Sequence, residues 1–334
     1  MNEAIDEKTL PNILSVGAAV PDRVLTNEDL EKMVDTSDEW ITSRTGIKHR
    51  HVLKEGETPS SLGVDASKEA IDRSPIGSEN IDLVIVATNI SDMPIPGSSP
   101  FIARELGLSD DIPFFDIKAG CSGFLYAIDV AANMIRGNGY DEILVIGLEA
   151  LSRVVNWEDR STCVLFGDGA GAAVIGTRGD KGKILSTSVF GDPSKAELIR
   201  LEGGGTRLPP AEGSEDDERY YVEMEGKGVF KSAVNMMKRS SLKVLKDANL
   251  SLSDVDWIVP HQANIRIIKQ LAKSLSVSMD RVIVNVEEYA NTSTATIPLA
   301  LKEGVDDGAI QSGDVVLLTA FGAGAAYGST LIKW

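Results

Sequence analysis

Cysteine and histidine are scarce in this sequence, and their scarcity excludes several kinds of site. The 334 residues include only two cysteines, Cys121 and Cys163, and three histidines. Two cysteines cannot build a disulfide framework. The spacings Cys-x-x-Cys and His-Glu-x-x-His, which are typical of zinc sites, do not occur. We therefore expect no metal centre and no disulfide-stabilised scaffold.

Long apolar runs and excess positive charge are also lacking. No run of about 18 or more uncharged apolar residues occurs, so a transmembrane helix is not expected. Residues 1–7 are acidic, whereas a signal peptide begins with a basic and then an apolar segment. The formal net charge of −17 disfavours nucleic acid and anionic membranes as partners. These absences together predict a cytoplasmic protein.

The apolar residues that are present follow the pattern of an α/β fold. Short apolar runs alternate with longer amphipathic ones along the chain. A hydrophobic fraction of 43% over 334 residues suffices for one large domain or for two fused halves. The most irregular stretch, 203–217, is rich in glycine, proline and acidic residues and predicts a surface loop.

An internal repeat favours two halves. Three strand-like segments recur: 81–89 as 255–264, 113–117 as 281–285, and 142–147 as 314–318. The offsets are 174 positions from Asp82 to Asp256, 170 from Cys121 to Asn291 and 172 from Ile143 to Val315, which suggests two copies of one α/β unit, 1–178 and 179–334. Chance similarity between apolar strands is the alternative. In a duplicated unit, Cys121 and Asn291 would occupy equivalent turns, near strand ends where α/β proteins place their chemistry.

Cys121 lies between an apolar strand and a strong helix. The helix carries an apolar face and stops near Gly137; the face consists of Phe124, Ile128, Ala131 and Ile135. A thiol at a helix N-terminus meets unpaired N–H groups and the positive end of the dipole, which favour the thiolate. The alternative is a small buried core cysteine. Cys163, in the continuous apolar run 162–166, is interpreted as that kind of residue on a core strand.

His261 and Asn291 are the candidate partners of Cys121. His261 follows an apolar strand, and because His49 and His51 lie in a basic cluster, it is the remaining candidate acid, base or hydrogen-bond donor. A structural hydrogen-bonding role is the alternative. Asn291 could be an ordinary helix N-cap, but in the repeat it corresponds to Cys121.

Two glycine-rich segments receive different interpretations. Residues 321–328 follow a buried strand, and their small side chains would let backbone N–H groups face a ligand, as an oxyanion hole requires. Close backbone packing is the alternative. Residues 166–172 resemble a phosphate loop but lack its Gly-Lys-Ser/Thr ending, so we predict a tight structural turn.

A cluster of positive charge stands out in this acidic chain. It follows Trp40 and comprises Arg44, Lys48, His49, Arg50 and His51. An aromatic ring beside arginines suits an adenine and its phosphates, through stacking and charge-assisted hydrogen bonds. A solvated turn with incidental charge is the alternative.

Taken in order, these motifs strongly resemble the type III β-ketoacyl synthases of the thiolase superfamily. The resemblance covers essentially the whole chain. The segments that carry it are 34–41, 44–47, 121–124, 159–161, 166–173, 260–264 and 291–293.

The resemblance implies a five-layered αβαβα thiolase-like fold, a homodimer and a two-stage reaction without a cofactor. Cys121 would take an acyl group from acyl-coenzyme A, a substrate. Malonyl-acyl-carrier protein would then lose carbon dioxide and attack the acyl-enzyme. His261 and Asn291 would donate hydrogen bonds to the enolate, and the N–H groups of Cys121, Ala323 and Gly324 would hold the oxyanion.

The resemblance also assigns binding contacts. Trp40 and Arg160 would stack on the adenine and Arg44 would contact the nucleotide, while Lys231 and Arg266 would receive the acidic carrier protein. Ile95, in the loop 91–98, would close the acyl pocket of the partner subunit. Ile95 stands where some relatives that favour acetyl primers carry phenylalanine, which predicts a deeper pocket.

The sequence departs from the family pattern in two respects. Ala323 replaces the middle of three frequent glycines but keeps a backbone N–H, so we expect an intact oxyanion hole. Residues 325–327 replace Phe-Thr-Trp and Lys118 stands where alanine is usual, which affects substrate preference and not the reaction class. The alternative function is a thiolase-fold acyltransferase or ketide synthase of secondary metabolism. Thiolase itself would need a second catalytic cysteine. An inactive partner subunit would be expected to lack the nucleophile.

Overall fold

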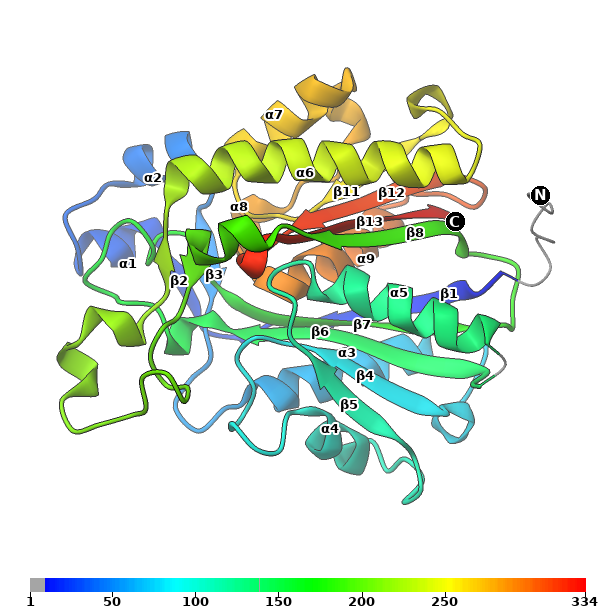
Figure 1. Ribbon diagram of the computed structural model, residues 1–334, viewed down its shortest axis with the longest axis horizontal. Coiled ribbons are helices and arrows are strands. Elements are labelled where there is room, and N and C mark those ends of the chain that lie inside the picture. The colour runs from blue at the N-terminus through cyan, green and yellow to red at the C-terminus, as the bar shows by residue number, and fades with distance from the viewer. Residues whose placement is uncertain (1–9, 138) are drawn as a thin grey trace.

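The computed structural model describes residues 10–137 and 139–334. The N-terminal segment 1–7, for which no signal peptide is expected, lies outside the described residues. Within those residues, no helix is long and apolar enough to cross a membrane. The chain forms five layers, in which helices lie above, between and below two layers of strands (Figure 1).

The strands follow one order, β11-β12-β13-β8-β1-β7-β6-β4-β5. The bounds are β1 Asn12–Ala19, β4 Leu83–Ala87, β5 Phe114–Ile117, β6 Glu142–Ala150, β7 Asp168–Gly176, β8 Lys183–Gly191, β11 Trp257–Pro260, β12 Val315–Phe321 and β13 Ala326–Lys333. Among the described residues, the register between β1 and β8 consists of the single pair Asn12 and Lys183. The strands therefore divide into two layers, β11-β12-β13-β8 and β1-β7-β6-β4-β5.

Helices cover both layers and fill the space between them (Figure 1). The outer helices above are α6 Gly226–Asp247 and α7 Ile265–Leu275, the central pair is α5 Gly123–Arg136 and α9 Thr296–Asp306, and those below are α3 Pro59–Asp72 and α4 Ser99–Glu105. Short elements complete the chain: α1 Asn27–Glu31, α2 Asp38–Thr45, α8 Val286–Tyr289, β2 Val24–Thr26, β3 His49–His51, β9 Ile199–Arg200 and β10 Glu223–Met224. This is the expected αβαβα arrangement.

The two strand layers have the same internal pattern. Strands β4 and β6 pair in parallel, and β6-β7 and β7-β1 pair antiparallel. Strands β11 and β12 likewise pair in parallel, and β12-β13 and β13-β8 pair antiparallel. The central strands β4 and β6 are buried throughout, as expected of strands covered on both faces. The expected boundary at 178/179 lies between β7 and β8, and the division into halves there stays a prediction.

Three local expectations were wrong. Residues 281–285 form no strand, because only Val282 bridges to β11 and a short helix, α8, follows. Residues 162–165 form a turn, although Cys163 is fully buried. Residues 168–172 begin strand β7 and are no turn. Gly171 allows α9 to pack on this strand, because a Cβ there would lie 2.6 Å from Pro298. The loop 203–217 was predicted correctly, with one short 3-10 helix at Ser214–Asp216.

Candidate active site

Cys121 lies at the entry to α5, where two backbone turns meet. Gly120 has φ +56°, and a Cβ there would lie 2.3 Å from the Ala323 nitrogen. A Cβ at Gly322 would lie 2.2 Å from the Cys121 nitrogen. Only glycines allow this approach. The N–H groups of Cys121 and Ala323 both hydrogen-bond to the thiol sulfur. The two backbone turns therefore pack closely and also direct these N–H groups toward the sulfur. Gly324, the third expected donor, follows with φ +72°.

Helix α5 forms as expected. Phe124, Ile128, Ala131 and Ile135 are all buried and pack between the two strand layers. The helix ends at Arg136, and the N–H of Gly137 caps it by donating to the Asn133 carbonyl. This packed face holds the N-terminus of α5, and with it Cys121, in place.

His261 follows the last residue of β11, and its backbone N–H donates to Thr319 O over 2.8 Å. Its ring Nδ1 lies 2.6 Å from the Thr296 hydroxyl. That hydroxyl donates to the Ser293 carbonyl oxygen over 3.0 Å, and a carbonyl can only accept. With the hydroxyl hydrogen on that carbonyl, the Thr296 oxygen accepts from Nδ1–H, and Nε2 carries no proton.

Asn291 approaches from the segment before α9. It bridges to Phe166, and its Oδ1 accepts from Ser293 N over 2.9 Å. The hydrogen bond resembles that of a helix cap, although the short 3-10 helix Ser293–Ala295 that follows has Thr292 at its N-cap position. Because Oδ1 is engaged, the Nδ2 group is the part of the amide that can donate to a bound molecule.

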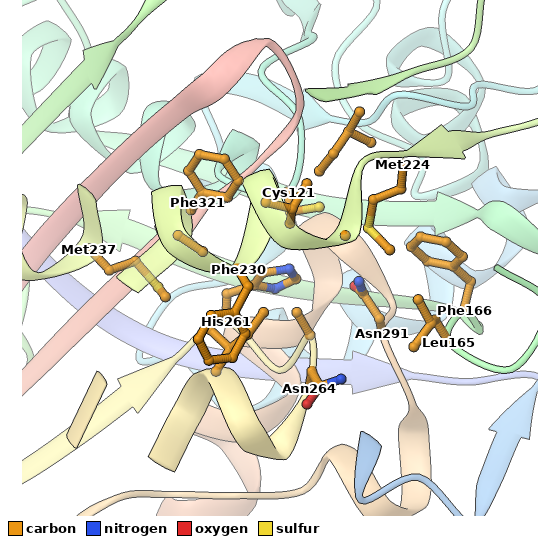
Figure 2. A pocket seen from close by; sticks show the side chains of 16 residues that line it. Cys121, Leu165, Phe166, Met224, Phe230, Met237, His261, Asn264, Asn291 and Phe321 are labelled. Carbon is orange, nitrogen blue, oxygen red and sulfur yellow. The ribbon is translucent and has the colours of Figure 1, made fainter. Parts of the chain in front are cut away.

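One pocket brings the three side chains together. Cys121, His261 and Asn291 line a cavity of about 170 Å³, and Figure 2 shows them pointing toward one another. Its other walls are largely apolar and include Leu165, Phe166, Ile199, Met224, Val229, Phe230, Met237, Ala263, Ile267 and Phe321. The pocket can admit a slender apolar chain to the thiol.

Burial sets the charge of the two titratable groups. It raises the pKa of Cys121 to about 11, although hydrogen bonds from Ser293 and from the N–H groups of Cys121 and Ala323 oppose it. The helix N-terminus was expected to favour the thiolate, but desolvation outweighs that effect. Burial also lowers the pKa of His261 to about 3. The resting site therefore holds a neutral thiol beside a neutral imidazole.

Two arginines flank Trp40 on α2. The guanidinium carbons of Arg44 and Arg160 each lie 4.7 Å from the centroid of the indole ring. Arg160 also donates from Nη1 to Asp35 O over 2.7 Å. The structure thus brings together the three residues expected to bind coenzyme A, although Arg160 is distant from the other two in sequence.

The rest of the expected positive cluster is not a free surface. Lys48 pairs with Glu287 at 2.7 Å. His49 pairs with Glu288 at 2.9 Å. Arg50 is fully buried and donates to Asn27 Oδ1 over 2.9 Å. The expectation was wrong here because β3 turns the Arg50 side chain into the interior.

The remaining expected site residues lie on the surface. Lys231 on α6 and Arg266 on α7 are exposed, and Arg266 donates to Ser43 O over 3.0 Å. Lys118 is exposed beyond β5. Ile95 is 87% exposed and does not line the pocket of its own chain.

Sequence reasoning missed a polar network beneath Cys121. Glu149, on β6, is fully buried, and its Oε1 accepts from both N and Nδ2 of Asn89 over 2.7 Å. Asn89 Nδ2 also lies 3.3 Å from Ser293 Oγ, which hydrogen-bonds to the thiol. In the described residues, Glu149 Oε2 has no partner. The sequence did contain a signal for this network, because Glu149 is a charged residue inside the apolar run 142–150.

Replacing Glu149 with glutamine should flatten the pH dependence of stability. Burial raises the pKa of Glu149 to about 8, so the folded protein keeps a proton that the unfolded chain has released. Wild-type stability should therefore fall by about 1.4 kcal/mol per pH unit as pH rises from about 5 toward 8. Glutamine cannot ionise. Denaturant unfolding at pH 6, 7 and 8 measures the difference, and parallel curves for both proteins would contradict the assignment.

Two family models match the chain. The one described as 3-oxoacyl-[acyl-carrier-protein] synthase III covers residues 115–193, and its C-terminal counterpart covers 245–334. The chain is 42% identical to the β-ketoacyl-[acyl-carrier-protein] synthase III of Caldanaerobacter subterraneus, over 98% of this chain and 99% of the relative. It is 44% identical to that of Natranaerobius thermophilus, over 96% and 98%.

Solved structures agree with these similarities. The crystal structure of the synthase III from Thermus thermophilus superposes with a TM-score of 0.90 and 42% identity, covering 97% of this chain and 99% of that one. The priming β-ketosynthase of the R1128 polyketide pathway superposes with a TM-score of 0.88 and 33% identity, covering 99% and 98%.

Proposed function

The chain belongs to the β-ketoacyl-[acyl-carrier-protein] synthase III family, and we propose that Cys121, His261 and Asn291 perform its chemistry. It is an acyltransferase that condenses an acyl-coenzyme A primer with malonyl-acyl-carrier protein, with loss of carbon dioxide, to initiate fatty acid biosynthesis. The observation that supports the three roles is that these side chains line one pocket.

In the first half-reaction, the Cys121 sulfur attacks the thioester carbonyl of the primer. Because burial keeps Cys121 protonated, a base must take its proton, and Nε2 of His261 would be that base when Nδ1 carries the ring proton. The carbon–sulfur bond to coenzyme A breaks, and the proton passes from Nε2 to the departing sulfur. The N–H groups of Cys121, Ala323 and Gly324 would stabilise the oxyanion that forms in between.

In the second half-reaction, the malonyl thioester loses carbon dioxide and its oxygen gains negative charge. Asn291 Nδ2 and His261 would donate hydrogen bonds to this enolate. The enolate carbon then attacks the acyl group on Cys121, and the sulfur leaves. The product is the β-ketoacyl thioester of the carrier protein.

Binding contacts are proposed for both substrates. Trp40 and Arg160 would stack on the adenine of coenzyme A, and Arg44 would contact the nucleotide. Their proximity supports this, since both guanidinium carbons lie 4.7 Å from the Trp40 ring centroid. The exposed Lys231 and Arg266 would receive the acidic carrier protein. No cofactor is needed, since the acyl-coenzyme A is a substrate. Two free cysteines agree with the reducing cytoplasm as the location.

The experiment that tests this function separates the two stages. Acyl-coenzyme A is added first, and the intact mass of the protein is measured. Malonyl-carrier protein follows, and the carrier is analysed for a β-ketoacyl group. Absence of product with every primer in a panel from acetyl to branched short chains would contradict the proposed function.

We also propose that the protein is a homodimer whose loop 91–98 contacts the partner's acyl pocket. Strand β5 ends the strand order and leaves one edge unpaired within the described chain. Phe114 on that strand is 45% exposed, and Ile95 in the loop is 87% exposed. Large apolar side chains exposed this way favour burial against another chain.

Replacing Ile95 with phenylalanine should shift primer preference toward acetyl-coenzyme A. A larger side chain at the partner's pocket would shorten it, and one methylene of apolar space is worth about 1–3 kcal/mol. We expect wild type to accept short branched primers beside acetyl, and the variant to favour acetyl by about tenfold more. Competition between acetyl- and isobutyryl-coenzyme A measures this ratio.

The control for Ile95→Phe is Met93→Phe, which adds bulk to the same exposed loop. It should leave the ratio of the two primers unchanged. An unchanged ratio in Ile95→Phe would mean that this side chain does not reach an acyl pocket.

A further inference from the structure

In the proposed function, on which this inference rests, His261 has two opposite tasks. In acylation it must accept the Cys121 proton at Nε2, and in decarboxylation it must donate a hydrogen bond from Nε2. A neutral imidazole carries one proton, so no single tautomer serves both tasks. The arrangement in which the Thr296 hydroxyl donates to the Ser293 carbonyl keeps the proton on Nδ1, which suits only the first task.

Thr296 is the side chain that faces Nδ1. It begins α9, is 2% exposed, and its hydroxyl oxygen lies 2.6 Å from Nδ1. A hydroxyl can accept and donate, so it can serve either tautomer by turning its hydrogen. No carboxylate is bonded to Nδ1 in the described residues, whereas a carboxylate would accept only and would hold the proton on Nδ1 permanently.

The Ser293 carbonyl permits this turn. It accepts from the Thr296 hydroxyl over 3.0 Å, and it also accepts from the backbone N–H of Thr296. When the hydroxyl hydrogen points at Nδ1 instead, the carbonyl keeps its backbone partner. The second arrangement therefore leaves no buried polar group without a hydrogen bond, so its cost is low.

We propose that Thr296 is a two-way hydrogen-bond partner that lets His261 serve as proton acceptor in acylation and as hydrogen-bond donor in decarboxylation. With the hydroxyl turned to Ser293, Nδ1 carries the proton and Nε2 takes the one from Cys121. With the hydroxyl turned to Nδ1, Nε2 carries the proton and donates to the enolate. The two neutral forms contain the same number of protons and exchange them with water in the open pocket. Thr296 is thus a positioning residue.

Thr296→Val tests the proposal, because valine has nearly the same shape and no hydroxyl. Next to valine, a buried Nδ1–H would lack an acceptor, which costs more than an unpaired lone pair. The proton should therefore move to Nε2. ¹⁵N NMR of histidine-labelled protein should show Nδ1–H in the resting wild type and Nε2–H in Thr296→Val. The His261 signals are identified by their loss in His261→Ala.

The two half-reactions should respond differently. In Thr296→Val, acylation by acetyl-coenzyme A should slow about 10²-fold, the lower end of what a general base contributes. Decarboxylation of malonyl-carrier protein should change by less than about threefold, because Nε2 already carries its proton. Thr296→Ser keeps the hydroxyl and should restore both rates. Thr330→Val, a buried threonine on β13 that bonds Thr187 outside the site, is the matched control for lost stability.

Three outcomes would overturn the proposal. The first is a resting wild type whose His261 carries its proton on Nε2. The others are a tautomer that does not change in Thr296→Val, or equal losses of rate in both half-reactions of that variant. His261→Ala separates this failure from a failure of the proposed function. If His261→Ala retains both half-reactions, the histidine has no role in the site. If it loses them while Thr296→Val behaves as wild type, only the role of Thr296 is wrong.

Discussion

Replacing Cys121 with alanine should abolish acyl-enzyme formation while the protein still folds. The proposed covalent intermediate is a thioester to this sulfur, and an alanine methyl group cannot form it. The rate of acyl transfer should fall by several orders of magnitude, as in other enzymes that lose their nucleophile. Intact-mass analysis after incubation with acetyl-coenzyme A should find one adduct per chain in the wild type and none in the variant.

Cys163→Ala is the matched control for this experiment. Cys163 is the other cysteine of the chain. It is fully buried in the hydrophobic core and does not line the pocket. Removing its sulfur should cost on the order of 1 kcal/mol of stability through lost apolar burial. The acyl adduct should remain. An adduct that persists in Cys121→Ala and vanishes in Cys163→Ala would identify Cys163 as the nucleophile.

Replacing Asn291 with alanine should impair decarboxylation far more than acylation. Asn291 Oδ1 is held by Ser293 N, so the amide presents Nδ2 as a donor. Losing one donor to a developing oxyanion costs about 3–4 kcal/mol, or on the order of 10²–10³-fold in rate. Release of carbon dioxide from malonyl-carrier protein measures the loss.

The acylation step is the internal control for Asn291→Ala. Acylation requires the thiol, the base and the N–H groups of Cys121 and Ala323, none of which is altered. Its rate should stay near the wild-type value, apart from small changes in the packing of the pocket. Equal losses in both steps would mean that Asn291 shapes the pocket and does not act on the enolate.

The sequence patterns predicted an α/β fold, and the family resemblance predicted its five layers and a site made of three side chains. The apolar face of α5 and the buried runs of β4 and β6 are local patterns, and burial follows directly from them. The repeat predicted that Cys121 and Asn291 would lie near each other, and they line the same pocket. Repetition carries tertiary information because two copies of one unit bury equivalent faces against each other.

The sequence was not sufficient where distant segments decide the local structure. The positively charged residues that follow Trp40 are close together in the sequence and predicted a positive patch. In the structure, Arg50 is buried and Lys48 is paired with Glu287. Glycines at 169 and 171 predicted a turn, whereas they form a strand because α9 packs closely on it. In each case the deciding partner lies far away along the chain.

Only the tertiary structure decided the charge states of the site. A cysteine at a helix N-terminus predicts a thiolate, but burial raises the pKa of Cys121 to about 11. The ring of His261 hydrogen-bonds to Thr296, 35 residues away, and the thiol contacts a network that leads to the buried Glu149. Desolvation and hydrogen bonding depend on every group that surrounds a side chain. The sequence therefore determined which residues meet, and the folded surroundings determined which of them holds a proton.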